Sequence, residues 1–136
     1  MQMRQMGQVH SATPPSVGRA RRAVSEFVGG VGGDSATISA IELAVSEACA
    51  NVTVHAYRDS DSPGEMVVLA SESHGSLEVR VIDHGIGLTP RFDSPGIGMG
   101  LPLMSSLADS FEAQSSEEAG TEIRMQFTLG RPEDAA

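Results

Sequence analysis

Four short motifs follow one another in a fixed order along this 136-residue chain, and their spacing constrains its fold more than any other feature. They are Glu47-Ala-Cys-Ala-Asn51, Asp83-His-Gly85-Ile-Gly87, Gly96-Ile-Gly98-Met99-Gly100-Leu101 and Gly120-Thr121. Each motif alone is weak, because acidic helix residues and glycine turns are common. Together they predict a nucleotide site assembled from a helix, strand ends and a glycine-rich loop.

The length and composition fit one small domain. Domains commonly run about 100 to 150 residues, and 40% hydrophobic residues suffice for one core at this size. With four Phe, one Tyr and no Trp, that core must consist mainly of aliphatic side chains. We expect a flexible segment or short edge strand over residues 1–12, with the strand near residues 8–12, then one folded domain over 13–129 and a disordered tail over 130–136.

The charge balance excludes several classes of function. Nine Arg, no Lys and 18 acidic residues give a net charge of -9. This charge argues against direct nucleic-acid binding, because phosphate backbones are neutralised by Lys and Arg. The absence of lysine also excludes a P-loop, whose Lys reaches the β and γ phosphates.

Cysteine content and hydropathy indicate the compartment. Cys49 is the only cysteine, which excludes an internal disulfide and fits a reducing environment. No uninterrupted run approaches the roughly 18 apolar residues that span a bilayer, and residues 1–10 lack the apolar stretch of a secretory signal. We therefore expect a cytoplasmic protein without a membrane partner.

Two amphipathic helices are predicted in the first half of the chain. Apolar residues recur at three- and four-residue steps over residues 16–28, after Pro14 and Pro15 interrupt the chain and before a cluster of glycines. Asp34 or Ser35 can cap a second helix. The apolar stripe of this second helix continues through about five turns, and its members are Ile38, Ile41, Val45, Ala48 and Val52.

The second half of the chain predicts two hairpins. Residues 65–71 and 77–82 alternate or run in β-branched and aliphatic types around a Ser-His-Gly-Ser turn. A helix over residues 101–108 and strands over 110–115 and 121–129 follow the glycine-rich stretch. This order predicts an α+β, two-layer sandwich in which a mixed, mostly antiparallel sheet carries its helices on one face.

Polar residues on the second helix suggest a metal ligand. Glu47, Asn51 and His55 are four residues apart and form one stripe. A solvated helix face would have the same pattern. The functional interpretation is that the Asn51 carbonyl oxygen binds Mg²⁺, which prefers oxygen ligands, while Glu47 activates an attacking hydroxyl or water.

Residues at two strand ends suggest recognition of a base. Asp83 directly follows a strand, where its carboxylate can accept a hydrogen bond from an adenine amino group. Gly85 and Gly87 leave room for a close approach of backbone. Thr121 opens the last strand, and its hydroxyl can bond the base directly or through water. Ordinary turns explain each of these sequences when it is taken alone.

The third motif suggests phosphate binding. Gly96, Gly98 and Gly100 precede a helix that begins near Leu101, so backbone amides would meet a positive helix N-terminus. A dinucleotide fingerprint is a weaker interpretation, because that motif follows a strand and has two residues before its last glycine.

At these residues the chain resembles the Bergerat-fold, or GHKL, ATPases, a superfamily that includes histidine-kinase catalytic domains and gyrase-type ATPases. The stretch Leu43-Ala-Val-Ser-Glu-Ala-Cys-Ala-Asn51-Val-Thr-Val-His55-Ala-Tyr57 is similar to the bacterial anti-sigma-factor serine/threonine kinases. The resemblance covers roughly residues 12–129 and implies the Bergerat ATP-binding fold.

The resemblance implies roles for individual residues. Asn51 would bind magnesium, Glu47 would be the catalytic base and Asp83 would read adenine. Arg21, in the first helix, would lie near a partner-binding surface. The other residues expected to bind the nucleotide are His55, Gly85, Gly87, Gly96, Gly98, Met99, Gly100, Leu101 and Thr121.

The expected function is that of an ATP- and Mg²⁺-dependent serine/threonine kinase that binds a sigma factor and phosphorylates an anti-sigma-factor antagonist. A homodimer is a further expectation, because relatives often form dimers. The alternative is a nucleotide-gated binding module without significant kinase activity, since only eight residues, including Arg91 but no lysine, separate Gly87 from Gly96. A third alternative is a small scaffold whose glycine turns are accidental.

Overall fold

A single sheet and the helices on one of its faces make up the described part of the chain. The computed structural model describes residues 3–57, 61–85, 103–116 and 120–129. In chain order the elements are β1 (Arg4–Ser11), α1 (Pro14–Gly30), α2 (Ser35–Asn51), the π-helical turn η1 (Val52–Ala56), β2 (Glu65–Ser73), β3 (Ser76–Asp83), β4 (Ser110–Ser116) and β5 (Gly120–Thr128).

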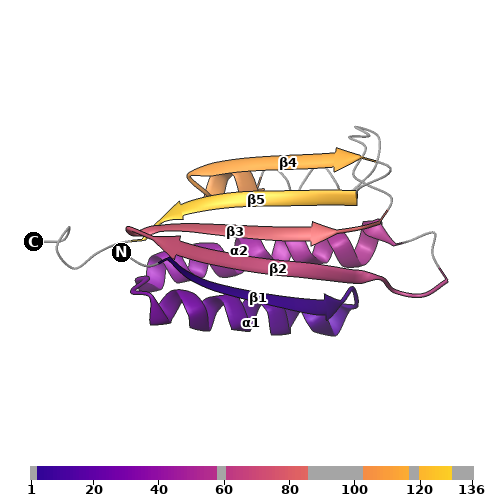
Figure 1. The fold of residues 1–136 in the computed structure, drawn as a ribbon, viewed down its shortest axis with the longest axis horizontal. Coiled ribbons are helices and arrows are strands. Elements are labelled where there is room, and N and C mark those ends of the chain that lie inside the picture. The colour runs from indigo at the N-terminus through magenta and orange to yellow at the C-terminus, as the bar shows by residue number, and fades with distance from the viewer. Residues whose placement is uncertain (1–2, 58–60, 86–102, 117–119, 130–136) are drawn as a thin grey trace, which may run out of the picture.

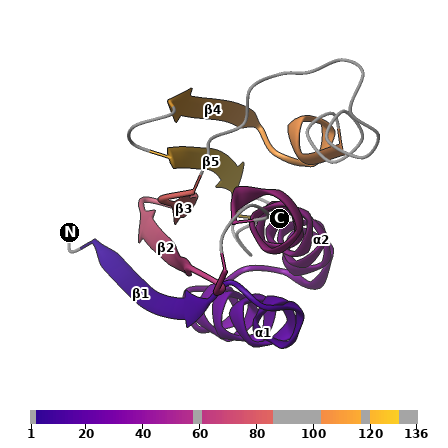
Figure 2. The same cartoon turned by 90° about the vertical axis from the view of Figure 1, so that its right-hand side faces the viewer.

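The five strands form one sheet in the order β1-β2-β3-β5-β4. All four strand pairs are antiparallel, so the sheet is more uniform than the mixed, mostly antiparallel sheet expected from the sequence. Figures 1 and 2 show α1 beneath the β1–β2 side and α2 beneath the centre, both on the same face. The predicted α+β two-layer architecture is thereby confirmed.

The core lies between the helices and this face of the sheet. Alternate residues of β2, β3 and β5 are buried, as a sheet with one covered face requires. Most buried side chains are aliphatic or methionine, which confirms the expectation drawn from the few aromatics. The largest fully buried ones are Ile41, Met66, Leu77, Met104, Ile123, Met125, Val24, Val28, Val45, Val68, Val79 and Val81.

The helix boundaries differ from the predictions in two places. Pro14 and Pro15 do not precede the first helix but begin it, because proline suits the first turn, where the backbone N–H has no intrahelical partner. The second helix begins as predicted, with the Asp34 side chain accepting a hydrogen bond from the Thr37 N–H at 2.8 Å. After Asn51 its winding changes from α to π, which periodicity in the sequence did not indicate.

Both predicted hairpins form. In the first, Ser73 pairs with Ser76 across His74 and Gly75, whose φ angles of 54° and 80° give the left-handed pair that suits a two-residue hairpin turn. The second joins β4 to β5. Residues 103–107 form a short helical segment within the predicted helix over 101–108, whose first two residues lie outside the described ranges.

The N-terminal strand is longer than the edge strand expected near residues 8–12. All eight residues of β1 pair with β2, from Arg4 opposite Glu72 to Ser11 opposite Glu65. The sequence of β1 does not alternate between apolar and polar residues. β1 is the edge strand of the sheet, and most of its residues are exposed. Backbone pairing, rather than side-chain burial, therefore determines its extent.

The helical segment Ser35–Ala56 is long and apolar enough to cross a membrane by length and composition alone, with a mean hydropathy of 1.2 over its best window. In the fold its apolar side packs on the sheet. The buried residues of α2 are Ile41, Ala44, Val45, Ala48 and Cys49.

Gly120 is the glycine whose replacement should harm the fold most clearly. Its φ is +83°, and a Cβ there would overlap the Asp83 carbonyl and lie 2.7 Å from the His84 Cα. Gly120→Ala should therefore lower the free energy of unfolding by at least about 2 kcal/mol. Gly18→Ala is the matched control, because Gly18 lies inside α1 and a Cβ there would meet only the Arg21 guanidinium, at an ordinary contact distance of 3.6 Å; this variant should stabilise by about 0.5 to 1 kcal/mol. Urea denaturation of both variants measures the difference, and a Gly120→Ala protein as stable as wild type would contradict it.

Candidate functional site

A narrow pocket lies where the end of α2 and η1 meet β3 and β5. Asn51 from the helix and Asp83 from the strand end both line it, so the two residues on which the sequence interpretation rests share one cavity. The complete lining is Asn51, Val52, His55, Ala56, Val81, Asp83, Thr121 and Ile123.

The strand register explains why four of these residues meet. Asp83 lies directly opposite Thr121, and Val81 lies opposite Ile123, in the antiparallel β3–β5 pair. Side chains at a directly opposed pair point to the same face, and residues two apart on one strand share that face. The polar pair of Asp83 and Thr121 therefore lies where β3 ends and β5 begins. The apolar pair of Val81 and Ile123 lies beside it on the same face.

Asp83 is a buried carboxylate with 4% of its surface exposed. Desolvation by burial raises the pKa of Asp83 above its usual value of 3.8. The backbone N–H of Gly85, 2.9 Å from Oδ1, and that of Thr121 donate to the carboxylate and oppose this rise. Such a buried, half-satisfied acceptor at the edge of a cavity is suited to a ligand that donates a hydrogen bond.

Asn51 contributes an unsatisfied amide to the same pocket. Among the described residues, its Nδ2 atom is buried and has no hydrogen-bond partner. Buried polar groups are nearly always paired in folded proteins, so an orphan in a cavity indicates a ligand. Because the O and N of a carboxamide are assigned rather than observed, the group fits Mg²⁺ coordination through its oxygen.

The metal would need further ligands beyond this amide. Within the described ranges, no group of three or more His, Cys, Asp and Glu side chains could hold a metal ion. One protein oxygen with phosphate oxygens and waters is a usual arrangement for Mg²⁺ in phosphoryl-transfer sites. The residues present therefore fit a magnesium ion that arrives with a nucleotide.

The predicted stripe of Glu47, Asn51 and His55 is interrupted by η1. Glu47 is half-buried one turn before Asn51 and is not among the residues that line the pocket. His55 lies within the π turn and does line it. The wider winding of a π turn, a feature often found at functional sites, thus lies between Asn51 and His55.

Gly85 and Gly120 allow backbone segments to approach closely beside the pocket. A Cβ on Gly85 would overlap the carbonyl group of Ala56, so the glycine makes room for η1. Gly120 makes room for the Asp83 carbonyl. The other glycine positions singled out by sequence, with Met99, Leu101 and Arg91, lie outside the described residues; the glycines are Gly87, Gly96, Gly98 and Gly100.

Sequence reasoning missed the apolar walls of the pocket. Val81 precedes Asp83 by two residues and Ile123 follows Thr121 by two, so strand periodicity could have placed both on the same face. Val52 and Ala56 belong to η1, and no pattern in the sequence revealed that turn. Arg21 lies elsewhere, exposed on α1.

Comparison with known proteins gives consistent sequence matches. The histidine kinase-like ATPase domain family matches residues 10–127. The chain is 30% identical over 123 residues to the anti-sigma F factor of Caldanaerobacter subterraneus subsp. tengcongensis, covering 82% of this chain and 85% of that protein. It is also 30% identical over 120 residues to the anti-sigma F factor of Clostridium perfringens, covering 80% and 85% respectively.

Solved structures show the same architecture. The RsbU and RsbW domains of Rv1364c from Mycobacterium tuberculosis superpose with a TM-score of 0.76 at 25% identity, over 95% of this chain and 33% of that chain. The histidine kinase domain of the blue-light activated histidine kinase from Erythrobacter litoralis EL346 superposes with a TM-score of 0.57 at 23% identity, over 83% of this chain and 61% of that chain. The similarity to the Erythrobacter litoralis domain supports the fold alone.

Replacing Asp83 should change how stability depends on pH. A carboxyl group whose folded pKa is raised contributes stability below its unfolded pKa, and that stability is lost as pH rises through the folded pKa. Asp83→Asn removes the titrating carboxyl group, so the variant does not lose this stability as pH rises. The stability of the variant relative to wild type should therefore increase as pH rises from below the usual value of 3.8 to neutrality. Chemical denaturation across this pH range measures the difference, and a constant difference would contradict the buried, raised carboxyl.

Proposed function

The chain belongs to the histidine kinase-like ATPase domain family, in the branch that holds the anti-sigma F factors, and from this premise we propose that it is an ATP- and Mg²⁺-dependent anti-sigma factor with serine/threonine kinase activity. The single observation that carries the proposal is the shared pocket of Asn51 and Asp83. We further propose that the protein acts in the cytoplasm.

ATP would bind with its base beside the ends of β3 and β5. Asp83 accepts a hydrogen bond from the adenine amino group, and Thr121 provides a second polar contact. The apolar pair Val81 and Ile123 contacts the base. The orphaned amide of Asn51 supports this orientation, because it gains the partner that it lacks. The buried Asp83 carboxylate, which already accepts from two backbone N–H groups, gains one further donor.

Asn51 would hold Mg²⁺ at the phosphate end of the nucleotide. The metal ion, when bound, neutralises charge on the phosphate oxygens. His55 lines the same pocket and contributes to nucleotide binding. The backbone amides around Gly87, Gly96, Gly98 and Gly100, together with Met99 and Leu101, are proposed from sequence alone to hold the phosphates.

Glu47 would act as the catalytic base. It lies one turn before Asn51 on α2 and outside the pocket lining. The hydroxyl oxygen of a serine or threonine on the antagonist forms a bond to the γ phosphorus as the bond to ADP breaks, and the hydroxyl proton passes to Glu47.

Partner binding is proposed on α1. Arg19, Arg21 and Arg22 are all exposed there, and residues 1–33 contain four Arg and only one acidic residue in a chain of net charge -9. Such a local basic surface attracts an acidic protein surface. Arg21 would contact the sigma factor or the antagonist.

A second candidate function is a nucleotide-gated binding module that transfers no phosphate. The eight residues between Gly87 and Gly96 favour it, since a short segment covers less of the phosphates. In that case ATP regulates partner affinity and Glu47 has no catalytic role.

Two substitutions separate transfer from binding. Glu47→Ala should lower phosphate transfer to the antagonist by 100-fold or more, a typical effect of removing a general base, and should leave ATP and sigma-factor binding intact. Arg21→Ala should weaken partner binding and leave ATP binding unchanged. Radiolabelled transfer assays and calorimetry with the purified partners measure both effects. If wild type binds Mg-ATP and the sigma factor but transfers no phosphate, the kinase proposal is wrong and the gated module remains.

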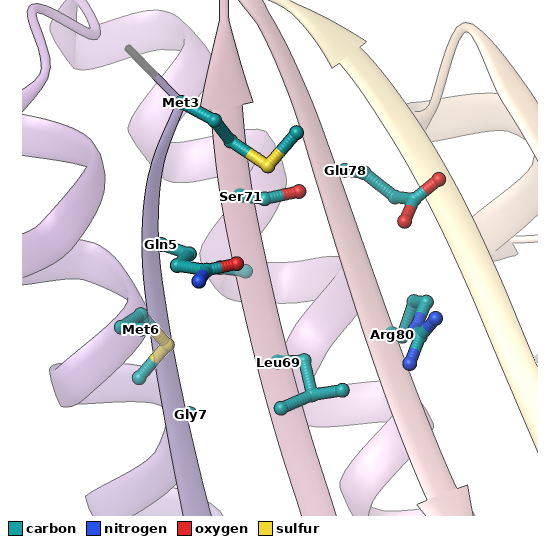
Figure 3. A pocket seen from close by; sticks show the side chains of 9 residues that line it. Met3, Gln5, Met6, Gly7, Leu69, Ser71, Glu78 and Arg80 are labelled. Atoms are coloured by element: carbon teal, nitrogen blue, oxygen red, sulfur yellow. The ribbon is translucent and has the colours of Figure 1, made fainter.

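The open face of the sheet is proposed as a homodimer interface. A groove of about 500 Å³ lies there, lined by residues of β1, β2 and β3. Figure 3 shows Leu69, Arg80 and Glu78 on neighbouring strands, with the helices behind them. Gly7 lets Leu69 lie across β1, since a Cβ on Gly7 would come within 2.8 Å of the Leu69 Cδ2.

This face has the chemistry that a two-fold contact requires. Arg80 lies 3.4 Å from Glu122, and Arg124 lies 3.5 Å from the same carboxylate, so both charge signs alternate on the face. Two apolar residues at this edge of the sheet are exposed: Met3, which lines the groove, by 60%, and Val9 of β1 by 61%. A two-fold interface uses one patch twice and must be self-complementary.

A charge in the groove should separate the dimer. Leu69→Glu places a carboxylate at its centre, and the dimer that we expect for wild type should become a monomer in sedimentation velocity. The matched control is Leu43→Glu, because Leu43 is 44% exposed on α2, on the other layer, and should leave the dimer intact. A dimer that persists in Leu69→Glu would place the interface elsewhere.

A further inference from the structure

Tyr57 joins three segments at the edge of the nucleotide pocket. It directly follows η1, and its hydroxyl donates a hydrogen bond to the Glu65 carbonyl at 2.6 Å. The same hydroxyl accepts a hydrogen bond from the backbone N–H of His84 at 3.0 Å. Both partners are backbone groups, so the contact holds the chain and not a mobile side chain.

The strand register shows what this hydroxyl replaces. Met66 pairs with Asp83 as the last residue pair at this end of the β2–β3 ladder. The next pair would be Glu65 with His84, and the tyrosine oxygen bonds both of them. Tyr57 therefore closes the ladder at the point where the chain leaves β3.

The surroundings of the ring are built closely around it. A Cβ on Gly64 would overlap three atoms of the Tyr57 ring, and a Cβ on Gly85 would overlap the carbonyl of Ala56, the residue before Tyr57. Glycine at both positions lets the ring and η1 approach the ends of β2 and β3. Gly64 therefore packs against the ring itself, and Gly85 packs against the residue that precedes it.

The residue held by Tyr57 is the neighbour of Asp83. The His84 N–H bonds Tyr57, and the next N–H along the chain, that of Gly85, bonds the Asp83 carboxylate at 2.9 Å. Release of His84 would free the turn that orients this carboxylate in the pocket. A rigid orientation matters because the carboxylate distinguishes bases by one hydrogen bond.

From these contacts we propose that Tyr57 is a positioning residue for base selectivity: it holds the Asp83–His84–Gly85 turn so that the Asp83 carboxylate accepts from an adenine amino group and rejects guanine. This inference rests on the proposed ATP site. Guanine carries a carbonyl oxygen where adenine carries its amino group, so a correctly oriented carboxylate repels it.

Tyr57→Phe tests the inference, because it removes both hydrogen bonds and keeps the ring. With Mg-ATP and Mg-GTP as probes, the variant should bind ATP roughly ten-fold more weakly than wild type, while GTP binding changes little. The ATP-to-GTP affinity ratio should therefore fall by about the same factor. A merely structural role for Tyr57 would weaken both nucleotides equally and leave the ratio unchanged.

Thr53→Val is the matched control. Thr53 lies in η1, the π turn that precedes Tyr57, and does not line the pocket. Its hydroxyl donates a hydrogen bond to the Ala50 carbonyl at 2.9 Å. This variant should bind Mg-ATP and Mg-GTP as tightly as wild type does. If Tyr57→Phe fails to fold, Gly64→Ala displaces the ring with its hydroxyl intact and should lower the ratio in the same way.

The fluorescence of Tyr57 reports directly on the environment of its ring. It is the only tyrosine in a chain without tryptophan, so the tyrosine emission of the protein comes from this ring alone. ATP should change that emission in wild type, and GTP should change it less. An unchanged affinity ratio in a folded Tyr57→Phe protein would overturn the inference. Wild type that binds neither nucleotide would instead overturn the proposed function.

Discussion

The packing of α2 and η1 against the middle of the sheet is the contact on which the site depends. Ile41, Ala44, Val45, Ala48 and Cys49 are buried along one side of the helix, and the small side chains among them allow a close approach. This approach brings the end of the helix over the ends of β3 and β5. The amide of Asn51 and the carboxylate of Asp83 then meet in one pocket, although 31 residues separate them in the sequence.

The pocket has a cost in stability that its proposed function explains. An ionised carboxylate at Asp83 is desolvated, and the Asn51 Nδ2 atom has no partner within the described part of the chain. A protein that needed only to fold would replace both with apolar residues. Retention of a desolvated carboxylate and an unpaired amide at one cavity is expected where a bound nucleotide provides them with further partners.

The two layers of the fold separate the proposed roles. The helix layer carries the pocket and the exposed arginines of α1, whereas the open face of the sheet carries the groove at Leu69. Under this proposal, nucleotide and partner would bind on the helix side, and a second copy of the chain would occupy the sheet side without covering the pocket. Tyr57 connects the layers, because its ring follows the helix and its hydroxyl bonds the ends of two strands.

Local signals in the sequence predicted most elements. The Asp34 cap, the apolar stripe of the second helix and the His74–Gly75 turn each depend on residues close in the chain, so their patterns are visible without a structure. The polar strand β1 was predicted too short because its pairing with β2 is made by backbone atoms. The prolines at 14 and 15 predict an interruption before the helix, whereas they form its first turn, which accepts proline.

The sequence by itself determined the chemistry available: a carboxamide on a helix, a carboxylate after a strand, glycines near both, and the order in which they occur. Only the tertiary structure decided which of these groups meet. The placement of Asp83 opposite Thr121 and the bridge from Tyr57 to His84 both join residues far apart in the chain. Their geometry follows from how the helix packs on the sheet, and no local pattern encodes that packing.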